Sequence, residues 1–355
     1  MSSIRLIRST AVVGAALLLL AACAPAPEKP GEGGEGTDFC ARMVTNSGGL
    51  DDRSFNDASW KGLQESADEF GIDVDVLVST SETDLAPNVQ QAVDTGCGFI
   101  LTVGYELAPA TEKFAAANPD VDFAIVDEVV TADNVKPIVF DTAQAAFLAG
   151  YLAAGVSKSG VVATFGGGNQ PPVTLFMDGF VDGVAYYNEK HGTKVKALGW
   201  SKSKQDGVFT GDFEDTGKGF TVTKNFIDQG ADVILPVAGQ VGEGAAAAAL
   251  EEGNTSIIWV DNDGYDTLPE KYRPILLTSV LKNTADAVVD IADSSLSDTF
   301  TNDAFIGTLD NGGVDIAEYH DLASSVSDEL SGEIDALRED IISGAVEVTS
   351  PSTPK

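Results

Sequence analysis

Positive charge is scarce in this sequence. Lys and Arg together number 21 against 55 Asp and Glu residues, so the formal net charge is -34. Proteins that bind nucleic acid, or that attach to anionic membranes through polybasic segments, need Lys and Arg to meet the phosphates. We therefore expect no nucleic acid partner and no polybasic membrane contact. We interpret the acidic excess as a solvating surface, which names no partner by itself.

The sequence also has few residues of the kinds that hold metals or act as nucleophiles. It has two His and three Cys residues, with no CxxC, HExxH or GxSxG pattern. Neither His191 nor His320 directly follows a predicted strand, and carboxylate pairs arise by chance in so acidic a chain. We expect no metal, no cofactor and no enzymatic activity.

The first 22 residues have the features of an export signal. Arg5 and Arg8 precede the apolar run AVVGAALLLLAA, which is too short to span a bilayer. LAAC then places small residues directly before Cys23, which resembles the bacterial lipobox, where the Cys is lipidated. The alternative is an ordinary signal peptide with Cys23 incidental. Residues 23–37, rich in Pro, Gly and Glu, predict a flexible tether.

Two cysteines remain beyond Cys23. Cys40 and Cys97 each begin a predicted strand, in CARMVT and CGFILTVG. Export to an oxidising environment permits disulfides, so we expect one between these neighbouring strand ends. Two buried thiols are the alternative.

Short apolar runs alternate with helical patterns along the rest of the chain. A first set comprises CARMVT, DVDVLVS, GFILTVG, DFAIVD and IVFD, and a second set comprises GVVATFG, KVKALGW, DVILPVA and SIIWVD. This alternation predicts an α/β protein with two doubly wound parallel-sheet lobes. We expect lobe 1 to hold residues 38–143 and about 277–300, and lobe 2 residues 144–276 and about 301–349. Residues 350–355 would form a tail.

Ligands of open parallel sheets bind beyond the carboxyl ends of the strands, so residues there are candidates. In SGGLDDRSFNDASW, we expect Asp52 to be among the ligand-binding residues, with capping of the following helix by Asp52 or Ser54 as the alternative. Phe55 would stack on a flat, uncharged ligand. Asp127 and Asp261 follow strands at matching places in the two lobes. Both could hold the hydroxyls of a polyol, although a turn or cap role is the alternative.

Glycines and one lysine follow other predicted strands. Gly239 permits close backbone contact with a ligand, or merely a tight turn. Lys282 would hydrogen-bond a ring nitrogen or hydroxyl, unless it is a surface charge; we place it after a strand that returns to lobe 1. GGGNQPP lacks the third Gly of GxGxxG, because Pro171 stands there, so we expect no phosphate loop.

Several segments, taken in chain order, resemble the basic membrane protein family, the substrate-binding lipoproteins of ABC transporters. They include GGLDDRSFNDASWKGL, AQAAFLAGYLAA, GADVILPVAG, WVDND and GTLDNGGVDIAEY, within about residues 38–348. The resemblance implies a type I periplasmic-binding fold, with two lobes joined by a three-strand hinge and a nucleoside, of the purine class, in the cleft. One departure is Ala238-Gly239-Gln240, where the family often has a Gly pair.

The resemblance also implies roles for particular residues. Phe55 would stack on the base, with Phe213 or Phe176 as a second aromatic. The other implied ligand contacts are Asn56 and Asp127 near the ribose or base edge, Gly239 through its backbone, Asp261 on ribose hydroxyls, and Lys282 as a donor.

The expected protein is a monomeric, lipid-anchored receptor on the extracytoplasmic face of the cell membrane. It would deliver a nucleoside to the permease and ATPase subunits of an importer. Two alternatives stay open: the same scaffold binding a sugar or other polar metabolite, and a surface or signalling lipoprotein that feeds no transporter.

Overall fold

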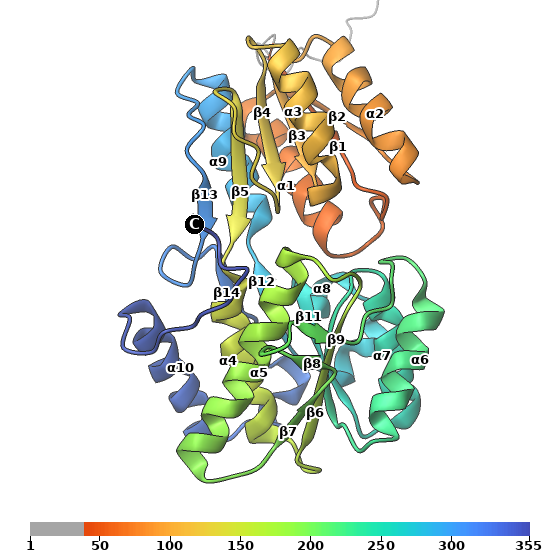
Figure 1. Cartoon of the computed structure of the whole chain (residues 1–355), viewed down its shortest axis with the longest axis vertical. Helices are drawn as coiled ribbons and strands as arrows, with labels where there is room; N and C mark the ends of the chain where they lie inside the picture. Colours follow the sequence, from red (N-terminus) through yellow and green to blue (C-terminus); the bar gives the residue numbers. More distant parts are fainter. Residues whose placement is uncertain (1–38) are drawn as a thin grey trace, which may run out of the picture. The chain divides into compact units, whose positions relative to one another are not determined.

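The computed structural model describes residues 39–355, and residues 37–355 form one compact unit. The expected signal peptide, the lipidated Cys23 and the tether lie outside the described residues. Within the described part, one parallel sheet and one sheet that is parallel except at its edge strand form two lobes, each covered by helices (Figure 1). This arrangement confirms the two α/β lobes predicted from the alternating pattern.

The first lobe is built on a sheet whose neighbouring strands are all parallel. Its strands, in spatial order, are β13 (Phe305–Gly307), β5 (Val135–Phe140), β4 (Asp122–Val126), β3 (Phe99–Val103), β1 (Cys40–Val44) and β2 (Asp73–Leu77). Its helices are α1 (Phe55–Phe70), α2 (Glu82–Asp94), η1 (Tyr105–Leu107), α3 (Ala108–Ala117) and α9 (Thr284–Leu296).

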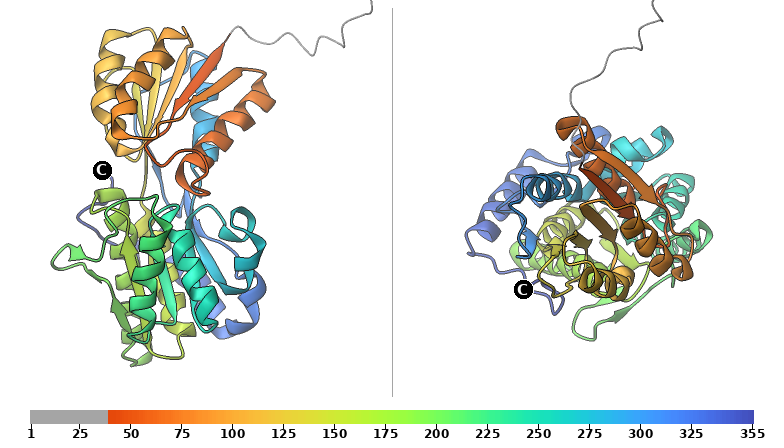
Figure 2. Two further views of the ribbon diagram at one scale, coloured as in Figure 1. Left: turned by 90° about the vertical axis from the view of Figure 1, so that its right-hand side faces the viewer. Right: turned by 90° about the horizontal axis from the view of Figure 1, so that it is seen from above.

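The central strand β3 shows why this sheet is covered on both faces. All five of its residues are buried. Successive side chains of a strand point to opposite faces, and here Leu101 packs in one cluster with Leu63 of α1, whereas Ile100 packs in another with Val89 of α2. The left view of Figure 2 shows the sheet between these two helical layers.

The second lobe has a sheet that is parallel except at β14, which runs antiparallel to β12. Its strands, in spatial order, are β14 (Val314–Ile316), β12 (Leu276–Lys282), β11 (Ser256–Asp261), β10 (Val233–Val237), β6 (Val161–Gly166) and β7 (Lys196–Leu198). A separate hairpin is formed by β8 (Trp200–Ser201) and β9 (Asp206–Gly207).

Helices cover both faces of the second sheet. They are α4 (Thr142–Val156), α5 (Pro171–His191), α6 (Thr216–Ile227), α7 (Val241–Glu252), α8 (Gly264–Thr267), η2 (Glu270–Ile275), η3 (His320–Ser325) and α10 (Asp328–Ile342). On one face Leu235 packs in the cluster that contains the residues of α4 and α5. On the other, Ile234 packs with Phe226 of α6 and Ala245 of α7.

The apolar helix α4 lies in the core, against α5. A Cβ at Gly183 would overlap the carbonyl oxygen of Phe147, and one at Gly150 would overlap the carbonyl of Phe180. The glycines therefore let the two helix backbones approach closely, which buries α4 on nearly every side. Among residues 39–355, no helix has both the length and the hydropathy needed to cross a membrane.

The chain passes between the two sheets after β5, after β12 and between β13 and β14. Two strands differ from the boundaries expected from sequence. β12 pairs with β11 and belongs to the second sheet, so the segment placed in lobe 1 from residue 277 starts there only after Lys282. β13, expected in lobe 2, pairs with β5 in the first sheet. Strand partners decide the lobe, and the order of apolar runs along the chain does not specify which strands pair.

Cys40 and Cys97 are joined in a disulfide, with their Cα atoms 4.8 Å apart. Cys40 begins β1, and Cys97 lies just before the start of β3 at Phe99. β3 is the strand beside β1. The bond therefore links two neighbouring strands at their amino ends, away from the edge that faces the other lobe.

Candidate ligand-binding site

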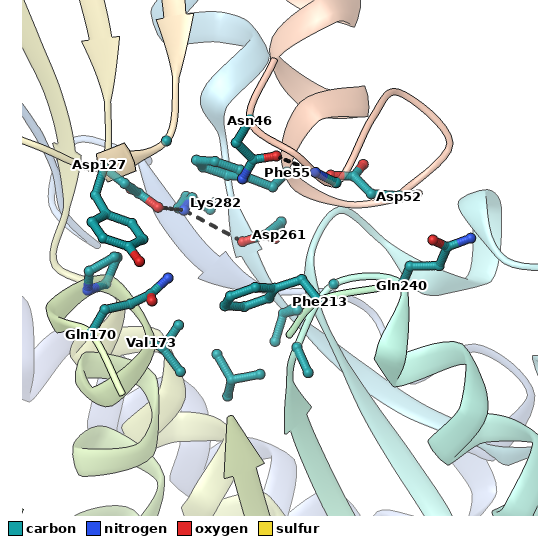
Figure 3. A pocket seen from close by; sticks show the side chains of 18 of the residues that line it. Asn46, Asp52, Phe55, Asp127, Gln170, Val173, Phe213, Gln240, Asp261 and Lys282 are labelled. Carbon is teal, nitrogen blue, oxygen red and sulfur yellow. Dashed lines mark hydrogen bonds and ion pairs between the residues drawn. The ribbon is translucent and has the colours of Figure 1, made fainter. Parts of the chain in front are cut away.

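A cavity of about 650 Å³, including its open mouth, lies between the two lobes. Its walls in the first lobe come from the segments after β1, β3 and β4. In the second lobe they come from the segments after β6 and β10, the segment before α6, and the last residues of β11 and β12. The carboxyl ends of both sheets thus meet at one place, as expected for open parallel sheets. Figure 3 shows the side chains that surround it.

Two phenylalanine rings lie on opposite sides of this cavity (Figure 3). Phe55 is the first residue of α1, and Phe213 lies in the segment before α6. Space for the Phe213 ring comes from the GGGNQPP stretch, because a Cβ at Gly167 would overlap that ring. The glycine run therefore positions an aromatic side chain.

Phe176, the other aromatic candidate, does not line the cavity. Its side chain is 2% exposed and lies in the apolar core. It sits within α5, on the side of the helix that faces the sheet and α4. The expectation that Phe176 could stack on a ligand is wrong, because helical spacing alone does not tell which face of α5 is buried.

The cavity contains a buried lysine between two aspartates. Lys282 Nζ lies 2.6 Å from Asp127 Oδ2 and 3.6 Å from Asp261 Oδ1, and its side chain is 3% exposed. Burial alone would lower the pKa of Lys282, but the two carboxylates outweigh it and raise the pKa above its ordinary value. The lysine is therefore a charged donor at the end of β12. It also lies 4.5 Å from the centroid of the Phe55 ring.

Asp127 and Asp261 share an unusual backbone conformation. Their φ angles are 66° and 67°, in the left-handed region that non-glycine residues rarely occupy. Such strain amounts to about 1–3 kcal/mol per residue and gathers at functional sites. Neither side chain caps a helix: the Asp261 carboxylate instead accepts the Ser54 hydroxyl and contacts Lys282.

The two lobes also touch directly beside the cavity. In addition to the contact of Ser54 with Asp261, the amide of Asn262 donates to the carbonyl of Ser54 at 3.0 Å. Arg53 donates to the carbonyl of Thr267 at 3.1 Å. The loop before α1 is therefore held against the second lobe along one edge of the site.

Asp52 supports the cavity wall as the cap of α1. Its carboxylate accepts the backbone N–H groups of Ser54, Asn56 and Asp57, whereas the Ser54 side chain makes no capping bond. Burial raises the pKa of Asp52 to about 6, against the lowering effect of these three donors. The capping role that was weighed for Asp52 is present, and the residue also lines the cavity.

Asn56, expected as a ligand contact, lies behind the wall. It is 1% exposed, does not line the cavity, and its amide donates to Asn46 Oδ1 at 2.8 Å and to Asp52 Oδ2 at 3.0 Å. Asn56 is the second residue of α1. Its side chain points toward the loop after β1 and away from the cavity. Asn56 therefore orients Asn46, which does line the cavity.

Sequence reasoning missed several residues that line the cavity: Asn46, Tyr105, Glu106, Gln170, Val173 and Gln240. Asn46 follows β1, Tyr105 and Glu106 follow β3, and Gln170 follows β6. The strand-end rule applied to these segments too, so the same signal could have found them. Gly239, which was expected, lines the cavity with a φ of 52°.

Comparison with known proteins agrees with this geometry. The family described as ABC transporter substrate-binding protein, PnrA-like, matches residues 40–352. The chain belongs to this family. Among its relatives is a Lactococcus lactis subsp. cremoris protein named "ABC transporter nucleoside-binding protein BmpA", 30% identical over 98% of this chain and 99% of the relative. Another is "Basic membrane protein A" of Borreliella burgdorferi, 28% identical over 90% of this chain and 91% of the relative.

A solved structure supports the fold. The crystal structure of an ABC transporter solute-binding protein from Aeropyrum pernix K1 superposes with a TM-score of 0.78 at 23% identity, and covers 88% of this chain and 94% of that one. The expected type I periplasmic-binding fold is thus confirmed, as is membership of the basic membrane protein family. A protein of this PnrA-like family is a substrate-binding component, which presents its ligand to the permease and ATPase subunits of a transporter.

Proposed function

We propose that this protein binds a purine nucleoside between its two lobes and delivers it to the permease of an importer. We further propose that it does so from the extracytoplasmic face of the cell membrane, as a monomer anchored by lipid on Cys23. The observation that carries the nucleoside assignment is the pair of rings, Phe55 and Phe213, on opposite sides of a cavity that also holds Asp127, Asp261 and Lys282.

Two kinds of contact are needed to hold a nucleoside, and the cavity has groups for both. A flat heterocycle between Phe55 and Phe213 would gain ring contacts on both faces. The ribose offers hydroxyl groups that both donate and accept. Asp127 and Asp261 would accept from them, and the Lys282 ammonium would donate.

The charge of the cavity favours a nucleoside over a nucleotide. Four carboxylates line it, those of Asp52, Glu106, Asp127 and Asp261, against the single ammonium of Lys282. Four negative charges and one positive charge leave a formal excess of three negative charges when all are ionised. A phosphate would add further negative charge to this low-dielectric site, where like charges repel strongly. The name of the Lactococcus relative, which specifies nucleoside binding, supports the same assignment.

Binding would close the cleft further by hinge motion at the three connections between the lobes. A ligand shifts this equilibrium only through contacts that differ between the open and closed forms. A base held by Phe55 from the first lobe and by Phe213 from the second makes such contacts, because both are available only when the lobes approach.

Isothermal titration calorimetry tests the ligand. We expect binding of inosine, guanosine or adenosine, and affinity at least about a hundredfold lower for the matching 5′-monophosphate. Free ribose and galactose serve as sugar ligands, and native mass spectrometry of freshly purified protein would reveal a ligand carried through purification. Binding of a sugar with no heat from any nucleoside would favour the alternative metabolite. Binding of no small molecule would favour a surface or signalling role.

Membrane fractionation tests the anchor. The wild-type chain, expressed in a bacterium that processes lipoproteins, should be found in the membrane fraction, and Cys23→Ser should release it. A Cys23→Ser variant that stays in the membrane fraction after a salt wash would contradict lipid anchoring.

A further inference from the structure

Glu106 lines the cavity but has no part in the contacts described so far. It lies in η1, directly after β3, and its Oε2 atom is buried with no hydrogen-bond partner among residues 39–355. Burial raises the pKa of Glu106 against the lowering effect of its own backbone N–H, and the nearby carboxylates of Glu82 and Asp127 raise it further. An acceptor left buried without a donor is unfavourable, so a ligand that brings a donor would relieve it.

Gly104 keeps the space beside this oxygen free. Its φ angle is 113°, and a Cβ there would lie 2.8 Å from Glu106 Oε2 and 3.3 Å from Asn46 Nδ2. Any other residue would be strained and would push these two side chains aside. The glycine thus allows the Glu106 carboxylate and the Asn46 amide to lie close to one another at the ends of β3 and β1.

The orientation of the Asn46 amide follows from its neighbours. Its Oδ1 accepts the backbone N–H of Gly48 at 3.0 Å and the side-chain amide of Asn56 at 2.8 Å. Asn56 in turn donates to Asp52, which can only accept when ionised. Oδ1 of Asn46 is therefore occupied, and its NH₂ group, which has no partner within the described chain, is the group left for a ligand.

A donor beside an acceptor complements a particular chemical edge. Hypoxanthine and guanine present a carbonyl oxygen next to a ring N–H, whereas adenine presents an amino group next to an unprotonated ring nitrogen. In the one base orientation that the proposed ribose contacts of Asp127, Asp261 and Lys282 set, these groups stand in opposite order, so adenine would place its ring nitrogen against the Glu106 carboxylate and its amino group against the Asn46 NH₂ group. We propose that Glu106 is a specificity-determining residue, which accepts the ring N–H of a 6-oxopurine while Asn46 donates to the adjacent carbonyl. This inference rests on the proposed nucleoside function and narrows it to inosine and guanosine over adenosine.

Affinity measurements with three nucleosides test the proposal. Wild-type protein should bind inosine and guanosine at least about tenfold more tightly than adenosine, because a mismatched edge leaves buried polar groups unpaired. Glu106→Met, which keeps the chain length but removes the acceptor, should weaken inosine and guanosine binding by about tenfold or more and change adenosine binding little. Glu106→Gln preserves the side-chain volume and should also reduce the preference for inosine and guanosine over adenosine.

Glu112→Met is the matched control, since Glu112 is exposed on α3 and does not line the cavity. It should leave all three affinities unchanged, and thermal melts should show every variant folded. Equal weakening of all three nucleosides by Glu106→Met would overturn the proposal, as would equal affinities in the wild type, although the nucleoside function would stand. Absence of any nucleoside binding by the wild-type protein would instead refute the proposed function itself.

Discussion

Replacing Lys282 by Met should destabilise the ligand-free protein strongly. The ammonium lies 2.6 Å from Asp127 and 3.6 Å from Asp261, and all three side chains are nearly buried. Its removal leaves two buried carboxylates without a counter-charge. Breaking a buried ion pair on one side lowers the free energy of unfolding by about 3–5 kcal/mol, because an uncompensated charge remains.

The size of this loss should depend on pH. Burial raises the pKa of Asp127 in the wild-type protein even against the lowering effect of Lys282. Without Lys282 that pKa should rise further above its value in the unfolded chain. A raised folded-state pKa makes the folded protein take up a proton, so stability is retained at low pH and lost as pH rises through that pKa. The Lys282→Met variant should therefore lose more stability at pH 8 than at pH 5.

Urea unfolding of ligand-free protein at both pH values measures the effect. Lys61→Met is the control: Lys61 is 65% exposed and lies 3.7 Å from Glu65, so its loss should change the free energy of unfolding by less than about 1 kcal/mol. The double variant Lys282→Met with Asp127→Asn should recover part of the loss at pH 8. A loss in Lys282→Met no larger than the control's at both pH values would refute the argument from buried charge.

The remaining predictions concern Phe213 and Phe176, the Asp52 carboxylate and the Cys40–Cys97 disulfide. Phe213→Ala should weaken nucleoside binding by about 1–3 kcal/mol with little change in the melting temperature. Phe176→Ala should lower the free energy of unfolding by about 3–5 kcal/mol, since it empties a core position. If Phe176→Ala weakened binding and Phe213→Ala lowered stability, calorimetry and melts would contradict the placement of both rings. Because burial raises the pKa of Asp52 to about 6 from 3.8, the folded state takes up a proton that the unfolded chain does not, and this contribution to stability grows as pH falls through that window. Asp52→Asn should remove this contribution, so an unchanged pH dependence of unfolding would argue against it. Intact mass after alkylation under denaturing, non-reducing conditions should show Cys40 and Cys97 unmodified, and two added labels without reductant would show free thiols.

Much of the site could be predicted because parallel sheets place the ends of their strands at a common edge. Phe55, Asp127, Asp261 and Lys282 were identified from that rule, and the structure brings all four to one cavity. The rule needs only the order of strands along the chain. The same rule applies to Glu106, which lies in η1 directly after β3.

Other features needed the packed structure. The choice between Phe213 and Phe176 depends on which face of α5 is buried, and helical periodicity does not distinguish the cavity side from the core side when most of the helix is apolar. The inward position of Asn56 depends on its bonds to Asn46 and Asp52. Both are decided by contacts between segments that local sequence does not describe.

The fold class, the two-lobed organisation and the identity of the chemical groups at the strand ends can be read from the sequence, because these follow from local periodicity and chain order. Three features instead depend on the packed molecule: Lys282 lies between Asp127 and Asp261, β12 and β13 belong to the lobes opposite to those expected, and Glu106 Oε2 has no hydrogen-bond partner among residues 39–355. Pairing between strands and between charges depends on distance in space, and segments as far apart in the chain as Asp127 and Lys282, or β5 and β13, become neighbours only when the sheets assemble.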